Sequence, residues 1–134
     1  MSVEYLDLAD YIAIATAVTG LDLQTVMNMT NHDLADSALH APAAGVGDTD
    51  FYPEFIDKAA VLVVRLARNH PLPDGNKRAA WVSLRLFVDI NDWTWMPTPT
   101  IDEAETAVLA IAAGEWDEAA AASWLQKHLR PPTD

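Results

Sequence analysis

Two long stretches without helix breakers, joined by a short loop with two prolines, constrain the fold of this chain more than any other feature. The segments 53–69 and 76–91 are apolar on most sides, which is typical of helices that neighbours bury all round. Pro71 and Pro73 interrupt the chain between them, and proline cannot continue a helix. The sequence therefore predicts two central helices joined by a tight loop over 70–76.

Shorter helices are predicted on both sides of this central pair. Asp, Asn and Gly mark most of their ends, because these residues satisfy or relieve the unpaired backbone groups there. On the N-terminal side, the predicted helices are 6–19, which ends at Gly20, 23–29, which Asp22 caps, and a segment to Leu39 that Asn31 or Asp33 caps. On the C-terminal side they are 101–113 and 116–129, on either side of Gly114. Pro53 and Glu54 suit the first turn of the earlier central helix. The breaker-rich segment 40–50 predicts a loop or a short hairpin, and 93–100 an extended connection. The predicted fold class is all-α, as a single domain over residues 1–134.

Charge and composition exclude several function classes. The chain has 20 acidic and 8 basic residues and a formal net charge of −12, so binding of nucleic acid or an anionic membrane over a broad surface is not expected. It has no cysteine, which excludes disulfides and thiolate metal sites. Neither a signal peptide nor an apolar run long enough to cross a bilayer is visible. We therefore expect a cytoplasmic protein.

The basic residues are concentrated in one part of the chain. Six of the eight lie between positions 58 and 85, where Asp74 is the only acid: Lys58, Arg65, Arg68, Lys77, Arg78 and Arg85. Such a cluster in an acidic chain is consistent with a confined anion site. Ordinary solvated side chains along two helices are the alternative, and the charge pattern alone leaves both open.

The loop between the central helices has the residues that phosphate chemistry needs. A helix N-terminus offers unpaired N–H groups and a positive dipole end to an anion, and Gly75 lets the backbone approach a phosphate. Lys77 and Arg78 add full charges beside it. His70 can exchange a proton near neutral pH, and Asp74 can hold Mg²⁺ against phosphate oxygens. Together they predict phosphoryl or nucleotidyl transfer.

Each of these residues also has a structural explanation. A histidine at a helix end is often a cap or a packing residue, and Asp74 followed by Gly75 is a common turn and N-cap. Asn76 is a good cap for the second central helix. The functional prediction thus depends on the combination of residues rather than on any one of them.

The run His70-Pro71-Leu72-Pro73-Asp74-Gly75-Asn76-Lys77-Arg78 resembles the signature of the Fic/Doc family, His-Pro-Phe-x-(Asp/Glu)-Gly-Asn-(Gly/Lys)-Arg. The similarity extends over about 5–130. It implies the helical Fic/Doc fold, in which the motif loop 70–78 joins two central helices. It also implies a flap at about 40–50 that pairs with an extended target chain by strand addition, with a plain connecting loop as the alternative.

Three positions distinguish branches within this family. Leu72 replaces the usual Phe, an apolar anchor, and is expected to pack less fully in the same role. Lys77 stands where adenylylating members have glycine, and Trp81 where they tend to have a further arginine. The chain therefore resembles the Doc (death-on-curing) toxin branch. Its members are kinases that transfer the γ-phosphate of ATP to elongation factor Tu, block translation, and are held in check by an antitoxin.

The resemblance also implies a role for each motif residue. His70 would take the proton from the target hydroxyl, and Asp74 would bind Mg²⁺ or orient His70. The phosphates of ATP would lie in a cradle of Gly75, Asn76 and Lys77 and would be clamped by Arg78. The expected partners are a cognate antitoxin and a protein substrate. An adenylyltransferase that tolerates Lys77, or a non-catalytic binding module, are the alternatives.

The other histidines and tryptophans are interpreted as structural. The spacing of His32, His40 and His128 cannot assemble a metal site, so surface or packing roles are predicted. Trp93, Trp95, Trp116 and Trp124 are predicted to pack the C-terminal helices. Arg65 and Arg68 share a helix stripe with Lys58, and extension of the phosphate pocket or simple solvation remain open for them.

Overall fold

Helices account for most of the fold, as predicted, in the computed structural model, which describes residues 2–133. The helices are α1 (Leu8–Thr19), α2 (Leu23–Met29), α3 (His32–His40), the 3₁₀ turn η1 (Ala41–Ala43), α4 (Phe55–Asn69), α5 (Asn76–Ile90), α6 (Ile101–Ala112) and α7 (Glu118–His128). Four two-residue strands complete it: β1 (Gly45–Val46), β2 (Thr49–Asp50), β3 (Thr94–Trp95) and β4 (Leu129–Arg130). None of the described helices is long and apolar enough to cross a membrane.

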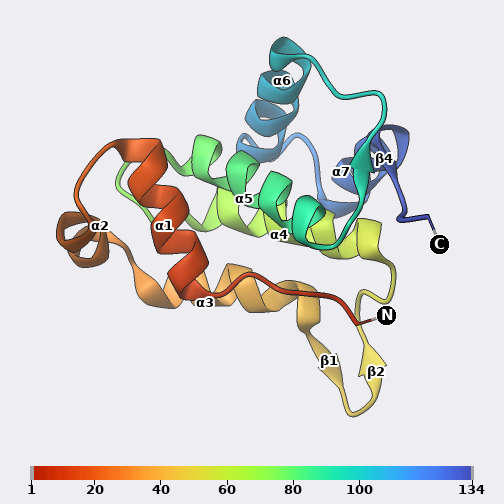
Figure 1. Ribbon diagram of the computed structural model, residues 1–134, viewed down its shortest axis with the longest axis horizontal. Coiled ribbons are helices and arrows are strands. Elements are labelled where there is room, and N and C mark those ends of the chain that lie inside the picture. Colours follow the sequence, from red (N-terminus) through yellow and green to blue (C-terminus); the bar gives the residue numbers. More distant parts are fainter. Residues whose placement is uncertain (1, 134) are drawn as a thin grey trace.

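The central helix α4 organises the core. It packs against α3, α5, α6 and α7, and Figure 1 shows α4 and α5 side by side in the middle of the molecule. Its buried side chains point in all directions around the axis, from Phe55 and Ile56 to Leu66 and Ala67. Each such Leu or Val contributes roughly 1.5–3 kcal/mol of hydrophobic free energy when fully buried. This explains why α4 is apolar on most sides, with its polar residues confined to one stripe that includes Lys58, Arg65 and Arg68.

Local capping signals set most helix ends. Asp22 accepts a hydrogen bond from the N–H of Thr25 and begins α2, and Gly20 ends α1 with a φ of 72°. For α3, the side chain of Asn31 is the cap, which settles the choice between Asn31 and Asp33. The start of α4 differs from the prediction, because Pro53 lies outside the helix and Glu54 is its N-cap.

Two short antiparallel sheets fix the connections. The hairpin predicted as one alternative for 40–50 is confirmed, with Gly45 opposite Asp50. The pairing of β3 with β4, which places Trp95 opposite Leu129, was not predicted. Two residues per strand are too few to give an alternating pattern in the sequence. This second sheet ties the extended segment 93–100 to the end of α7.

Three basic residues of the cluster support the fold rather than a phosphate site. Arg65 pairs with Glu118 of α7 at 3.0 Å. Arg68 donates hydrogen bonds to the carbonyl oxygens of Ile111 and Trp116. Both side chains are partly open to solvent, as the solvated alternative predicts, but each also has a partner within the fold. They join α4 to α7 and to the end of α6.

Lys58 anchors the hairpin to α4. Its side chain is only 2% exposed, and its Nζ lies 3.2 Å from the Asp50 carboxylate and 3.1 Å from the Pro42 carbonyl oxygen. Lys58 precedes His70 by twelve residues, which corresponds to about 18 Å along a helix. The hairpin and the motif loop thus lie at opposite ends of α4, as Figure 1 shows.

Candidate active site

The motif loop is closed by two residues in the left-handed region. His70 ends α4 with φ 53°, and Gly75 precedes α5 with φ 87°. A Cβ added at Gly75 would meet Val18 and Thr19 at 3.5 and 3.8 Å, which is ordinary contact. Glycine is therefore required here by the backbone conformation and not by space. Positive φ is uncommon for residues other than glycine, and histidine is among those that adopt it more often.

The first half of the loop is anchored in the core. Leu72 is 3% exposed and belongs to the main hydrophobic cluster. Such burial is consistent with its role as an apolar anchor. The Pro71 carbonyl oxygen accepts a hydrogen bond of 2.8 Å from the N–H of Asn31. The loop is thereby fixed to the start of α3.

Asn76 closes the loop from within. Its Oδ1 accepts a hydrogen bond from the Leu72 N–H at 2.9 Å, and its Nδ2 donates to the Leu72 carbonyl oxygen at 2.7 Å. The same Nδ2 lies 3.4 Å from Nδ1 of His70. The side chain is 8% exposed and provides no cap to α5. Asn76 thus touches the proposed base directly, a position that the sequence did not indicate.

The groups suited to phosphate chemistry face solvent. His70, Asp74, Lys77 and Arg78 are exposed. Within residues 2–133, neither Lys77 nor Arg78 forms an ion pair, and Asp74 forms no hydrogen bond with His70. No side chain of the described residues caps α5, which leaves its first N–H groups available to an anion. The start of α5 is therefore a candidate anion site: it is basic, and its charged residues have no ion-pair partner in this part of the chain.

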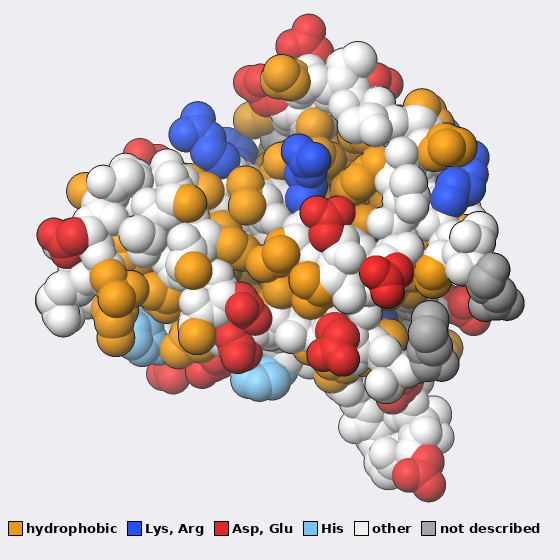
Figure 2. Space-filling model, viewed as in Figure 1, with side chains coloured by type: hydrophobic (Ala, Val, Ile, Leu, Met, Phe, Trp, Pro, Cys, Tyr) orange, Lys and Arg blue, Asp and Glu red, His pale blue; other side chains and the backbone are white. Residues whose placement is uncertain are grey.

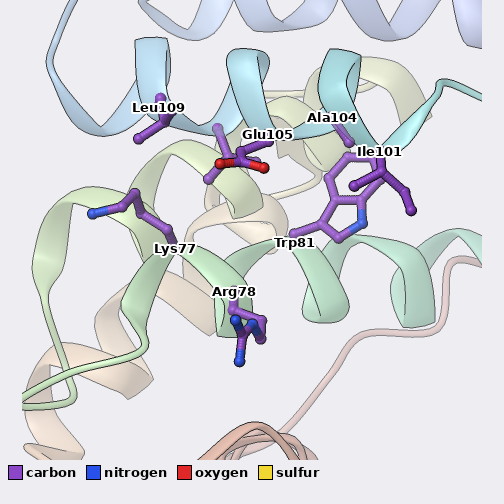
Figure 3. A pocket seen from close by; sticks show the side chains of 8 residues that line it. Lys77, Arg78, Trp81, Ile101, Ala104, Glu105 and Leu109 are labelled. Atoms are coloured by element: carbon purple, nitrogen blue, oxygen red, sulfur yellow. The ribbon is translucent and has the colours of Figure 1, made fainter.

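A cleft of about 420 Å³ adjoins this helix end. It lies between the first half of α5 and the helix α6 and is lined by Lys77, Arg78, Trp81, Ile101, Ala104, Glu105, Val108 and Leu109. Figure 2 shows Lys and Arg side chains beside an apolar hollow under α6. In Figure 3, Trp81 reaches from α5 toward α6, and Glu105 projects from α6 into the space between them. The cleft is basic at the motif end, and beyond it the lining is apolar apart from the carboxylate of Glu105.

The site residues fit Mg²⁺ only when phosphate completes the coordination. No group of three or more His, Cys, Asp or Glu among the described residues could hold a metal ion. Asp74 offers one exposed carboxylate beside the anion site. Mg²⁺ is commonly held by one or two carboxylates together with substrate phosphates and water. Asp74 is thus suited to Mg²⁺ that arrives with a nucleotide.

Trp95, Trp116 and Trp124 pack as predicted, and Trp93 stacks on Phe55 of α4 with ring centroids 4.7 Å apart. Trp81 contacts Trp95 and Trp124, with ring centroids 5.4 and 6.2 Å apart, and Trp116 contacts Trp124 at 6.2 Å. His128 is buried, with Nδ1 2.8 Å from the Pro97 carbonyl oxygen. These contacts join α5, α7 and the extended segment, and they fix Trp81 as one wall of the cleft.

Known proteins match this chain across the site. The model of the Fic/DOC family matches residues 5–88. Toxin Doc of Mycolicibacterium smegmatis is 37% identical over 114 residues, which cover 85% of this chain and 85% of that toxin. The family match contains the whole motif loop, both sides of the hairpin and nearly all of α5. All residues assigned above to the anion site lie inside it.

Proposed function

Because this chain belongs to the Fic/DOC family, we propose that it is the toxin of a toxin–antitoxin pair and an ATP-dependent protein kinase. It would transfer the γ-phosphate of ATP to a hydroxyl group of elongation factor Tu in the cytoplasm and so block translation. An antitoxin would hold it in check. The observation that carries this proposal is the uncapped, basic start of α5 beside the exposed His70.

The proposed reaction is an in-line transfer at the start of α5. The oxygen of the target hydroxyl forms a bond to the γ-phosphorus while the bond to the β–γ bridging oxygen breaks, and ADP leaves. His70 takes the proton of the hydroxyl. The N–H groups after Gly75, together with Lys77 and Arg78, stabilise the charge on the transferred phosphate. Asp74 would hold Mg²⁺, which neutralises phosphate charge.

We favour γ-phosphate transfer over adenylylation because Lys77 and Trp81 stand where adenylylating members of the family have glycine and tend to have arginine. A kinase needs room on one side of the reacting phosphate, because the rest of ATP leaves in a single direction. An adenylylator reacts at the α-phosphate and needs room on two sides. Here the cleft between α5 and α6 can take the remainder of ATP past Lys77, with the purine against Trp81. Trp81 packs on Trp95 and Trp124 and offers no charge to a further phosphate.

Labelled ATP tests which phosphate is transferred. The protein is incubated with purified elongation factor Tu, and with a cell lysate, in the presence of ATP labelled at either the α- or the γ-phosphate. We expect label to enter a protein target only from the γ position. Label that enters from the α position would show that the protein is an adenylyltransferase and not a kinase. Lys77→Gly should weaken phosphate transfer without creating adenylylation, since Trp81 remains.

A further inference from the structure

The backbone groups of Leu72 determine which atom of Asn76 faces His70, and therefore which of the two residues is the donor. An N–H of the backbone can only donate and a carbonyl oxygen can only accept. The Leu72 N–H therefore faces Oδ1 of Asn76 at 2.9 Å, and the Leu72 carbonyl oxygen faces Nδ2 at 2.7 Å. These two bonds fix which end of the amide is the NH₂ group. The NH₂ group of Asn76 is thus the donor that lies 3.4 Å from Nδ1 of His70.

A donor at this position determines where neutral His70 keeps its hydrogen. A neutral imidazole has one N–H and one nitrogen with a free lone pair. Because Nδ1 faces the Asn76 donor, it retains the lone pair, and the hydrogen is on Nε2. A general base needs a free lone pair on the nitrogen that meets the substrate. His70 in this tautomer cannot take a proton through Nε2.

We infer that Asn76 is a positioning residue that holds unliganded His70 in the Nε2–H tautomer, so that the site rests in a form unable to act as a base through Nε2. The inference rests on the proposed function only where it treats His70 as the base. Activation would require the Asn76–His70 contact to open and the hydrogen to move to Nδ1. At 3.4 Å this contact is the longest and weakest of the three that Asn76 makes.

The other three histidines provide internal references. Nδ1 of His40 lies 2.8 Å from the Asp36 carbonyl oxygen, and Nδ1 of His128 lies 2.8 Å from that of Pro97. Because these partners can only accept, both histidines carry hydrogen on Nδ1. Nε2 of His32 lies 2.9 Å from the Met27 carbonyl oxygen, so His32 carries it on Nε2. The chain therefore contains references for both tautomers.

Long-range ¹H–¹⁵N NMR of the ¹⁵N-labelled, ligand-free chain tests the inference at a pH about two units above the ordinary histidine pKa. We expect the ring pattern of His70 to match that of His32 and to differ from His40 and His128. The signals missing from His70→Gln identify His70. A pattern of the Nδ1–H type, or an even mixture of tautomers, would overturn the inference.

Asn76→Asp removes the donor and keeps an oxygen for the Leu72 N–H. In this variant His70 should change to the Nδ1–H pattern while the other histidines stay as they are. Asn69→Asp is the matched control, since Asn69 bonds to the Leu34 carbonyl oxygen and the His70 pattern should not change. An unchanged His70 in a folded Asn76→Asp protein would contradict the role of Asn76. If Asn76→Asp does not fold, the spectrum of the unsubstituted protein tests the tautomer of His70 by itself.

Failure of phosphate transfer would count against the proposed function alone, because the tautomers are measured without substrate.

Discussion

The side chains of the motif loop fall into two groups that differ in exposure. Leu72 and Asn76 are buried and hold the loop in shape, whereas His70, Lys77 and Arg78 face solvent. Substitution in the first group therefore changes the geometry of the loop. Substitution in the second changes its chemistry with little effect on folding, since exposed positions usually alter stability by no more than about 0.5 kcal/mol.

His70→Ala should abolish phosphate transfer and growth arrest while the melting temperature stays nearly constant. Removal of a general base typically lowers the rate by about 10²–10⁴-fold, and the exposed His70 ring contributes little packing. Transfer is measured with γ-labelled ATP, and growth after induced expression. A folded His70→Ala protein that still arrests growth at the normal level would contradict the assignment of the base.

Arg78→Ala should weaken the binding of ATP with Mg²⁺ by roughly 1.5–3 kcal/mol, the usual contribution of a charge-assisted hydrogen bond. Isothermal titration calorimetry measures the affinity directly. Arg85→Ala is the matched control, because Arg85 is exposed on the same helix and does not line the cleft. Equal affinities of the two variants would place the phosphates away from the start of α5.

At the scale of elements, the hairpin depends on one buried charge. Burial lowers the pKa of Lys58, but Tyr5 and the Asp50 carboxylate outweigh this effect and leave the pKa above its ordinary value. A raised pKa in the folded state means that the charged lysine stabilises the fold fully below its unfolded pKa of about 10.4. This contribution is lost only as the pH rises through the folded pKa. Loss of the Lys58 charge should therefore not weaken the anchoring of the hairpin at any pH below about 10.4.

Lys58→Met should lower the free energy of unfolding by about 1.5–3 kcal/mol, because it removes a charged hydrogen bond and leaves the Pro42 carbonyl oxygen without its partner. Urea unfolding measures the change. Lys127→Met, at an exposed lysine of α7, is the control and should cost no more than about 0.5 kcal/mol. A Lys58 variant as stable as this control would show that the buried lysine does not anchor the hairpin.

At the scale of the whole molecule, features with local signals could be predicted and features with distant partners could not. The caps at Asp22 and Asn31 depend on backbone groups only three residues away, so the sequence pattern contains them. The β3–β4 sheet joins Thr94 to Arg130, and no short pattern marks that pairing. Likewise, Asn76 suggested a helix cap or a phosphate ligand. Its contact with His70 depends on the left-handed turns of the loop, which the residue types alone do not specify.

The length of α4 sets a minimum size for any target that contacts both of its ends. Lys58, which holds the hairpin through Asp50, and His70 are separated by about 18 Å along this helix, and an extended chain covers about 3.3–3.6 Å per residue. A substrate strand paired with the hairpin would have to continue for five or six residues before its hydroxyl group reached His70. The acceptor residue would then be selected by its fixed spacing along the target chain from the paired strand.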